Sequence, residues 1–386
     1  MSKFIIIGPN DPALDALDAA LHARPHLNAE LRIIPWPEYR DTLMSGLNAA
    51  ESPWQAAFVP GHIWLPELAA KGLLAPLAPL SDALSDDVRE QYDAGDVIPA
   101  VSAECRYDDE AFLLPLFTDG HILFYLKECF DFGDDEVPVV STLDMAELAR
   151  KAHHPPKHAG LALKADASEI FTDWLPYLWE AGGSIFDDAG RPDIANPTNL
   201  AALTYYCSLQ AHAVPESSRF GNAEIADALR HSSAALIATW GGQAAPIFLD
   251  TSTTSRQQYR AAVFTTPWNA TWGVGIPANQ PQARQQQALD ALMQSMGPDT
   301  DAAIITTAGS PVRARTYTPE ARRRYPWLAA QQAMLQRAKP LPADPRLGLF
   351  LGDLYAFVHK AFTGEMSPEA ALQAAQARAL AALGLD

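Results

Sequence analysis

Short apolar runs alternate with helix-period patterns along the first part of the chain. Phe4 to Ile7 form a run rich in β-branched residues, and Asp11 and Pro12 then supply residues typical of an N-cap and a first helical turn. Leucines recur at helical spacing over residues 14–21, and residues 31–34 form a second apolar run. The pattern predicts a strand, a helix and a second strand parallel to the first.

The same rhythm continues through the next forty residues. It predicts a helix over residues 37–48, a strand over residues 56–59, and a helix that ends at Lys71 with Gly72 as the residue after its C-cap. Alternation of this kind is typical of a mostly parallel sheet that carries helices on both faces.

Later segments indicate a second lobe. Extended runs at residues 113–117 and 122–125 suggest a crossing between lobes, and the chain beyond Thr142 has mainly helical patterns, at residues 143–152, 174–181 and 200–211. A strand over residues 273–277 then returns to the first sheet, after a second crossing near Pro267. We therefore predict an N-terminal lobe of residues 1–115 and 268–313, and a C-terminal lobe of residues 116–267 and 314–386.

Composition supports this size and excludes two classes of partner. A chain of 386 residues with 48% apolar and 19% charged residues can bury two cores. The formal net charge of −18 repels phosphate backbones and anionic lipid headgroups, so we expect no nucleic acid partner. The unbroken apolar runs are far shorter than the roughly 20 residues that a membrane crossing needs.

The cysteines and the first residues give weaker indications. Cys105, Cys129 and Cys207 are too widely spaced for a zinc knuckle or a CxxC redox pair, so we interpret them as packing residues and leave a Cys105–Cys129 disulfide open. Met1 to Lys3 lack the apolar region of a signal peptide. The chain is therefore either cytosolic or separated from its leader.

Common catalytic and cofactor motifs are missing from the sequence. There is no GxxxxGK[ST], GxSxG, HExxH or EF-hand loop, so we predict no catalytic residue and no cofactor. His153, His154 and His158 surround two prolines in what we interpret as an exposed loop, and we predict no metal site there. The pair Tyr205 and Tyr206 lies in the middle of a predicted helix, which favours packing.

A series of motifs in one order resembles a known family. The motifs are the residues Trp54–Val59, Ala70–Leu77, Leu114–Lys127, Glu180–Asp187, Ala235–Gly241, Gly309–Arg313 and Gly364–Leu372. They are similar to those of the extracellular sugar-binding proteins of ABC transporters, in the maltodextrin-binding-like group, over essentially the whole chain. The resemblance implies an α/β, two-lobed periplasmic-binding-protein (Venus-flytrap) fold, with a sheet flanked by helices in each lobe and about three hinge crossings.

The family also implies a function and a location. Its members capture a sugar or oligosaccharide in the cleft between the lobes, deliver it to the permease subunits of an ABC importer, and catalyse nothing. We therefore expect a monomer that acts in the periplasm or at the outer face of a membrane, with its signal peptide already removed.

Sugar chemistry then selects candidate ligand-binding residues. A sugar offers apolar C–H faces and a rim of hydroxyls, so its site needs flat aromatic rings and polar partners. Many of the nine tryptophans lie at predicted strand ends, helix starts or crossings, where the carboxyl edge of a sheet presents side chains to a ligand. The aromatic and imidazole candidates are Trp36, Tyr39, His62, Trp64, Trp174, Trp240, Trp268 and Trp272.

Each candidate has an ordinary structural alternative. Any one tryptophan could be a core residue, as we interpret Trp54 and Trp179, and His62 could simply begin a helix. Asp119 could accept two sugar hydroxyls or could be a turn residue. Arg313 could bind hydroxyls or a carboxylate, or could form a salt bridge between the lobes.

Two other functions remain open from the residues. An acidic protein with aromatic walls also suits a polyamine or another cationic ligand, because ammonium groups bind ring faces. Tryptophan platforms also occur in glycoside hydrolases, which need a pair of facing carboxyl groups.

Overall fold

The computed structural model describes residues 3–133, 136–307 and 309–385, and the chain divides into two compact units. Unit 1 comprises Met1–Asp119, Ala270–Tyr325 and Ala343–Pro345, and unit 2 comprises Gly120–Asn269, Pro326–Pro342 and Arg346–Asp386. We placed the lobe boundaries at residues 115, 267 and 313, and the units change at residues 119, 269 and 325. The third boundary, predicted at residue 313 and observed at residue 325, differs most. Asp301 accepts hydrogen bonds from the Val312 amide and the Thr316 hydroxyl, which keeps this segment in unit 1.

Unit 1 is built on a mixed sheet with the strand order β2-β1-β3-β11-β6. Its strands are β1 (Phe4–Pro9), β2 (Ala29–Ile34), β3 (Ala56–Pro60), the first half of β6 (Leu113–Leu126) and most of β11 (Asn269–Gly275), with a small hairpin of β4 (Arg106–Tyr107) and β5 (Glu110–Ala111). Strands β2, β1 and β3 run parallel, as predicted, whereas β11 pairs antiparallel with β3. The carboxyl ends of the three parallel strands therefore meet at one edge of the sheet.

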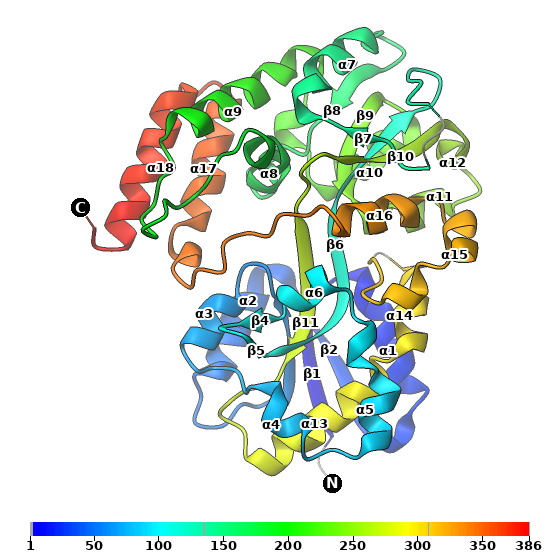
Figure 1. The fold of residues 1–386 in the computed structure, drawn as a ribbon, viewed down its shortest axis with the longest axis vertical. Helices are drawn as coiled ribbons and strands as arrows, with labels where there is room; N and C mark the ends of the chain where they lie inside the picture. The colour runs from blue at the N-terminus through cyan, green and yellow to red at the C-terminus, as the bar shows by residue number, and fades with distance from the viewer. Residues whose placement is uncertain (1–2, 134–135, 308, 386) are drawn as a thin grey trace. The chain divides into compact units, whose positions relative to one another are not determined.

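Helices cover the unit 1 sheet (Figure 1). They are α1 (Asp15–His22), α2 (Trp36–Leu47), α3 (Leu65–Ala70), α4 (Leu77–Ser81), α5 (Asp86–Tyr92), α6 (Pro99–Ala103), α13 (Gln282–Ser295), α14 (Pro298–Ile304) and α15 (Pro319–Arg324). The apolar faces of α1 to α5, α13 and α14 share one core with the sheet, in which Phe58, Leu17 and Leu289 are fully buried, whereas α15 buries no residue.

Unit 2 is built on a second sheet with the order β8-β9-β6-β10-β7. Its strands are the second half of β6, β7 (Val139–Val140), β8 (Ala159–Ala162), β9 (Ala234–Trp240) and β10 (Tyr259–Phe264). Strand β6 is antiparallel to β9 and β10, while β8 is parallel to β9 and β7 to β10. The carboxyl ends of β7, β8, β9 and β10 thus share one edge with the start of this half of β6.

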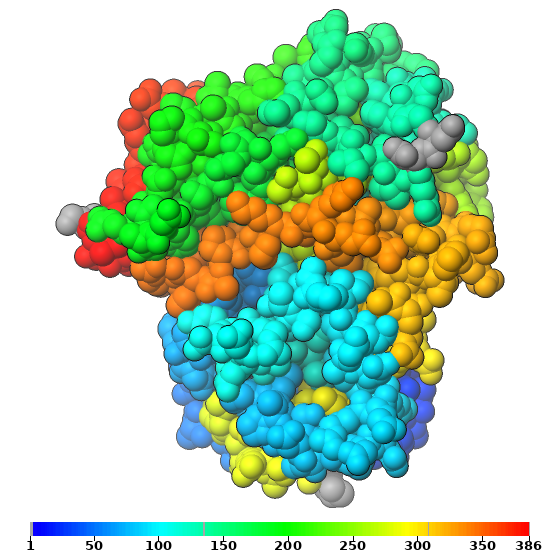
Figure 2. Space-filling view, in the orientation of Figure 1, coloured from blue at the N-terminus to red at the C-terminus, as the bar shows by residue number. Residues whose placement is uncertain are grey.

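The helices of unit 2 are numerous, as the sequence indicated. They are α7 (Met145–Lys151), α8 (Ile170–Glu180), α9 (Pro197–Ser208), α10 (Asn222–His231), α11 (Ala244–Phe248), α12 (Ser255–Gln258), α16 (Trp327–Leu335), α17 (Leu351–Phe362) and α18 (Pro368–Ala382). Figure 2 shows the red C-terminal helices directly against the green segment that contains α9, and α17 and α18 both pack on α9. Among the described residues, no helix combines the length and apolar character needed to cross a bilayer.

Local sequence signals explain several element ends. Asp11 caps the turn that precedes α1 and accepts a hydrogen bond from the Ala13 amide at 2.8 Å, with Pro12 as the next residue. Ser367 caps α18 in the same way, with Pro368 in the first turn. Gly72 follows the C-cap of α3 with a positive φ of 65°. These predictions are confirmed, because capping depends on neighbouring residues alone.

Strands β7 and β8 are absent from our sequence prediction. Both are short, and β8 is made of Ala-Gly-Leu-Ala, which has neither strong β propensity nor an alternating pattern. Pairing with β9 and packing on α7 fix β8 as a strand instead.

Candidate functional site

Three tryptophans meet at the carboxyl edge of the unit 1 sheet. Trp36 is the first residue of α2, directly after β2, and Trp64 is the residue before α3, after β3. Trp272 on β11 pairs in register with Pro60, the last residue of β3. Trp36 and Trp64 lie at one edge because β2 and β3 both run parallel to β1, whereas Trp272 reaches this edge from the antiparallel strand β11.

The rings form a stacked group. Trp36 and Trp64 lie nearly parallel, with ring centroids 5.8 Å apart and an angle of 6° between their planes. Trp272 meets Trp36 edge-on at 5.8 Å and stacks on Phe117 at 5.9 Å. Tyr39 stacks against both Trp36 and Trp64 at 6.3 Å. The His62 ring faces Trp272 at 6.4 Å. We name these six residues the unit 1 ring group: Trp36, Tyr39, His62, Trp64, Phe117 and Trp272.

Exposure within this group differs from ring to ring. Trp36 is 50% exposed, and Trp64 and Trp272 are half-buried. Tyr39 is fully buried, and its hydroxyl donates to the Phe58 carbonyl at 2.6 Å. Tyr39 therefore supports the stack from beneath, while the three tryptophans keep ring surface that a ligand can contact.

Polar side chains border the unit 1 ring group. The Arg40 guanidinium lies 5.6 Å from the centre of the Trp64 ring and pairs with Glu67 at 3.1 Å. The Nδ1 atom of His62 lies 3.3 Å from the Thr271 carbonyl oxygen, which only accepts, so this nitrogen donates. Burial lowers the pKa of His62 to about 4, against the smaller raising effect of that hydrogen bond. His62 is therefore neutral near pH 7.

A second group of rings lies at the carboxyl edge of the unit 2 sheet. His121 pairs in register with Trp240, the last residue of β9. The His121 ring meets Trp240 edge-on at 4.8 Å and Trp268 at 5.6 Å, and the two tryptophan rings are 5.1 Å apart. We name these three residues the unit 2 ring group. His121 and Trp268 are fully buried, and Trp240 is half-buried.

Charged side chains accompany the unit 2 ring group. Lys164, which follows β8, is fully buried and places its ammonium 4.3 Å from the centre of the Trp240 ring and 3.2 Å from a Glu169 carboxylate oxygen. Asp173 on α8 lies 3.6 Å from His121 Nδ1, and its other carboxylate oxygen accepts a hydrogen bond from the Tyr206 hydroxyl at 2.6 Å. Aromatic rings and charged side chains thus lie together at the carboxyl edge of the unit 2 sheet.

Burial sets the protonation of these groups. The pKa of Asp173 is raised to about 6, mainly by burial, although Tyr206 and Lys164 oppose the rise. The pKa of His121 falls well below its usual value, first because of burial and then because of the Lys164 charge. His121 is therefore a neutral imidazole at pH 7, and Lys164 is the cation of this group.

The structure places the remaining predicted residues as follows. Asp119 is the last unit 1 residue of β6 and is 8% exposed. Trp174 lies in α8, fully packed, with its ring against Phe171 at 6.2 Å. Arg313 lies in the interior of unit 1, over the Tyr92 ring at 4.6 Å, and donates to the backbone carbonyl of Asp93 at 2.8 Å.

Arg313 therefore joins neither ring group, although we predicted it as a ligand contact. Its guanidinium also donates to the Met296 carbonyl at 3.3 Å, and the side chain is fully buried, so packing inside unit 1 sets its position. We also considered a salt bridge between the lobes for Arg313. The structure shows another arrangement, because the carbonyl groups that Arg313 contacts belong to its own unit.

Sequence reasoning missed His121, Lys164, Glu169, Asp173 and Phe117. A usable signal existed for Lys164, since it is a single charge at the end of the apolar run Gly160–Leu163, where a short strand could have been expected. No local signal marked His121, because it lies inside β6 and only pairing with β9 brings it to Trp240.

Comparison with protein families identifies the chain. Residues 9–297 match the profile described as "Bacterial extracellular solute-binding protein". This chain belongs to that family. A comparison with curated protein sequences finds no match.

Solved structures of solute-binding proteins share the fold of this solute-binding protein. An ABC transporter solute-binding protein from Agrobacterium radiobacter K84, in complex with ribitol, superimposes with a TM-score of 0.85 at 18% identity, and the match covers 98% of each chain. Maltose-bound MalE3 of T. maritima gives a TM-score of 0.82 at 18% identity, again over 98% of each chain. The sugar-binding protein MalE of Xanthomonas citri gives 0.81 at 15% identity, over 99% of this chain and 98% of that one.

These likenesses confirm the predicted α/β fold of periplasmic binding proteins. The number of hinge crossings stays a prediction.

Proposed function

We propose that this solute-binding protein is the substrate-binding subunit of an ABC importer and captures a sugar, an oligosaccharide or a related polyol. The observation that carries the proposal is the unit 1 ring group, in which Trp36, Trp64 and Trp272 keep exposed surface at the carboxyl edge of the sheet. The relatives that bind ribitol and maltose support the same ligand class.

The chemistry of the rings fits a polyhydroxy ligand. The C–H face of a sugar or an extended polyol packs on a tryptophan face, while its hydroxyls need donors and acceptors at the rim. Arg40, whose side chain is 48% exposed, supplies donors beside Trp64. Asp119 stays part of the proposed site as an acceptor of hydroxyl hydrogen bonds.

A cationic ligand fits the rings less well. Arg40 already lies over Trp64, and Lys164 already lies over Trp240, so a cation of the protein covers one tryptophan in each ring group. A polyamine would compete with these charges and be repelled by them. The polyamine alternative therefore loses the support that the acidic composition gave it.

Binding without catalysis completes the proposal. The family is one of binding proteins, and we propose that this member turns over no substrate. Incubation with maltodextrins and aryl glycosides should give no product, which separates this function from the glycoside hydrolase alternative.

Partners and location follow the family. An extracellular solute-binding family acts in the periplasm or outside the cell. We propose that the protein is a monomer that delivers its ligand to the permease subunits of the importer, and that it is anchored at the membrane.

The proposal is tested by titrating the purified protein with defined ligands. The panel contains pentoses, hexoses, maltodextrins of increasing length, ribitol, mannitol and spermidine, followed by thermal shift and calorimetry. A ligand present at about 100 times its Kd should stabilise the folded protein by about 2.7 kcal/mol. We expect at least one sugar or polyol to do so and spermidine to have no effect. Stabilisation by spermidine alone would overturn the proposed ligand class.

A further inference from the structure

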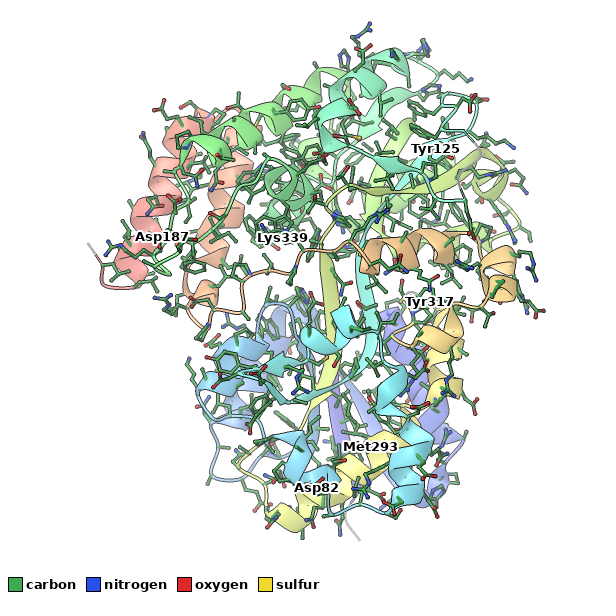
Figure 3. All side chains as sticks on the ribbon, viewed as in Figure 1. Asp82, Tyr125, Asp187, Met293, Tyr317 and Lys339 are labelled. Carbon is green, nitrogen blue, oxygen red and sulfur yellow. The ribbon has the colours of Figure 1, made fainter. Side chains whose placement is uncertain are left out.

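Two turns of unit 2 meet at the sheet edge opposite to the unit 2 ring group. Glu128 and Cys129 lie in the turn that follows β6, three and four residues after Tyr125, which Figure 3 labels on this strand. His158 immediately precedes β8, whose first residue, Ala159, pairs with Ala234 at the start of β9. Because β6 runs antiparallel to β9 and β8 runs parallel to it, the end of β6 and the start of β8 share one edge.

The side chains from these turns converge. One ligand atom from each of Glu128, Cys129 and His158 lies within 4.8 Å of the others. The Cys129 sulfur lies 3.8 Å from His158 Nε2. Tetrahedral Zn²⁺ with ordinary Zn–S and Zn–N bond lengths separates these two atoms by about 3.6 Å, so the present spacing needs almost no change.

The His158 ring is buried, and its Nε2 faces the Cys129 sulfur. It is 5% exposed, and its Nδ1 has no hydrogen-bond partner among the described residues. The turn that carries His158 is fixed by two backbone hydrogen bonds with His154, so the ring has a defined position.

The three side chains border a surface hollow of about 450 Å³. Glu128 is 57% exposed on its side chain, and Cys129 is half-buried, so an ion can enter from solvent. The hollow also has room for a water as a further ligand. Thiolate, imidazole and carboxylate groups are all ligands of Zn²⁺, whereas Ca²⁺ and Mg²⁺ prefer oxygen ligands alone.

We propose that Glu128, Cys129 and His158 form a Zn²⁺ site on unit 2, separate from the sugar-binding function. Binding converts the Cys129 thiol to a zinc thiolate and releases its proton to solvent. His158 donates a nitrogen lone pair, Glu128 binds through a carboxylate oxygen, and water completes the tetrahedron.

Lys157 competes with the ion in this site. Its ammonium pairs with the Glu128 carboxylate at 2.6 Å, and its side chain is 68% exposed. Zn²⁺ must displace this ammonium, which an exposed lysine allows at small cost, since an ion pair between exposed side chains contributes little to stability. The flanking Lys151 adds a second positive charge to the hollow. Removal of Lys157 should therefore tighten the site.

The sequence grouping of His153, His154 and His158 differs from this site. His153 Nδ1 lies 3.2 Å from the His212 carbonyl oxygen and is not one of the three converging ligands. Glu128 and Cys129 replace it, from a turn about thirty residues earlier in the chain. The histidines alone were too few for a metal site, whereas the two turns together supply three ligand types.

Cobalt titration of the full-length protein tests the site. Co²⁺ replaces Zn²⁺ and gives an intense thiolate-to-cobalt absorption band when a cysteine is bound. We expect one equivalent of Co²⁺ to produce this band, and an equimolar addition of Zn²⁺ to remove it. Cys129→Ser should abolish the band, whereas the matched control Cys207→Ser, at a half-buried cysteine elsewhere in unit 2, should keep it.

Affinity for Zn²⁺ gives a second, independent readout. Glu128→Gln changes an exposed side chain and should weaken Zn²⁺ binding roughly tenfold or more without unfolding the protein. Lys157→Ala should strengthen it severalfold. The proposal is overturned if the wild type gives no band, or if Cys129→Ser keeps the band of the wild type. Sugar binding should be equal in all these variants, so that failure here leaves the proposed function untouched.

Discussion

Lys164 places its ammonium 4.3 Å from the centre of the Trp240 ring, inside unit 2, and pairs with Glu169. The lysine side chain is fully buried, while the glutamate side chain is 17% exposed. A cation that is removed from water in this way depends on both the ring face and the carboxylate. The contact therefore couples the stability of unit 2 to the position of a tryptophan in its ring group.

Replacing Lys164 by Met should destabilise unit 2. The methionine keeps the apolar stem but leaves Glu169 without its cation, and we expect a loss of about 1–3 kcal/mol, below the cost of breaking a fully buried pair because Glu169 reaches solvent. Denaturant unfolding followed by tryptophan fluorescence measures the loss. The double variant Lys164→Met, Glu169→Gln should recover most of it, and a double variant as unstable as the single one would contradict this account.

Trp36→Ala tests the unit 1 ring group. Because this ring is 50% exposed, the variant should lose less than about 1 kcal/mol of stability. Its affinity for the sugar or polyol found in the panel should fall about 10- to 100-fold, at about 1.4 kcal/mol per factor of ten. Calorimetry measures the affinity. Phe357→Ala, at a half-buried ring on α17, is the control and should bind normally; unchanged affinity of Trp36→Ala would remove Trp36 from the site.

His62 should make unit 1 sensitive to mild acid. Its folded pKa is about 4, against 6.5 for the free side chain, because burial disfavours the charged ring. The unfolded chain therefore binds more protons between these values. The contribution of His62 to stability is fully present above pH 6.5 and is lost as the pH falls toward 4.

His62→Gln removes this titration and gives the measurement. Relative to the variant, the wild type should lose about 1–3 kcal/mol between pH 6.5 and pH 4. The other titrating groups are common to both proteins and cancel in the difference. A difference that stays constant over this range would show that His62 titrates normally in the folded state.

Two glycines should respond in opposite ways to alanine. A Cβ at Gly160, on β8, would lie 2.1 Å from the Ala149 carbonyl oxygen of α7, so Gly160→Ala must push the helix from the sheet. We expect a loss of about 2–4 kcal/mol, as for an overpacked core. A Cβ at Gly352, in α17, meets nothing within 4 Å, so Gly352→Ala should stabilise by about 0.5–1 kcal/mol. Thermal unfolding of the two variants measures both changes in stability. A Gly160→Ala variant as stable as the wild type would contradict the close approach of α7 to β8.

The sequence by itself determined the features that depend on neighbouring residues. The caps at Asp11 and Ser367 and the alternation of strands and helices in unit 1 follow from short-range hydrogen bonding and periodicity. The position of Trp36 at a strand end also follows from local order, because a parallel sheet sends every such end to one edge.

Only the tertiary structure decided which distant side chains meet. Pairing of β6 with β9 brings His121 to Trp240, and the shared edge of β6 and β8 brings Cys129 to His158. Arg313 shows the reverse case, since a motif suggested a ligand contact and packing on Tyr92 placed the guanidinium in a core. Strand register and burial are properties of long-range packing, and no local pattern of residues encodes which partners they select.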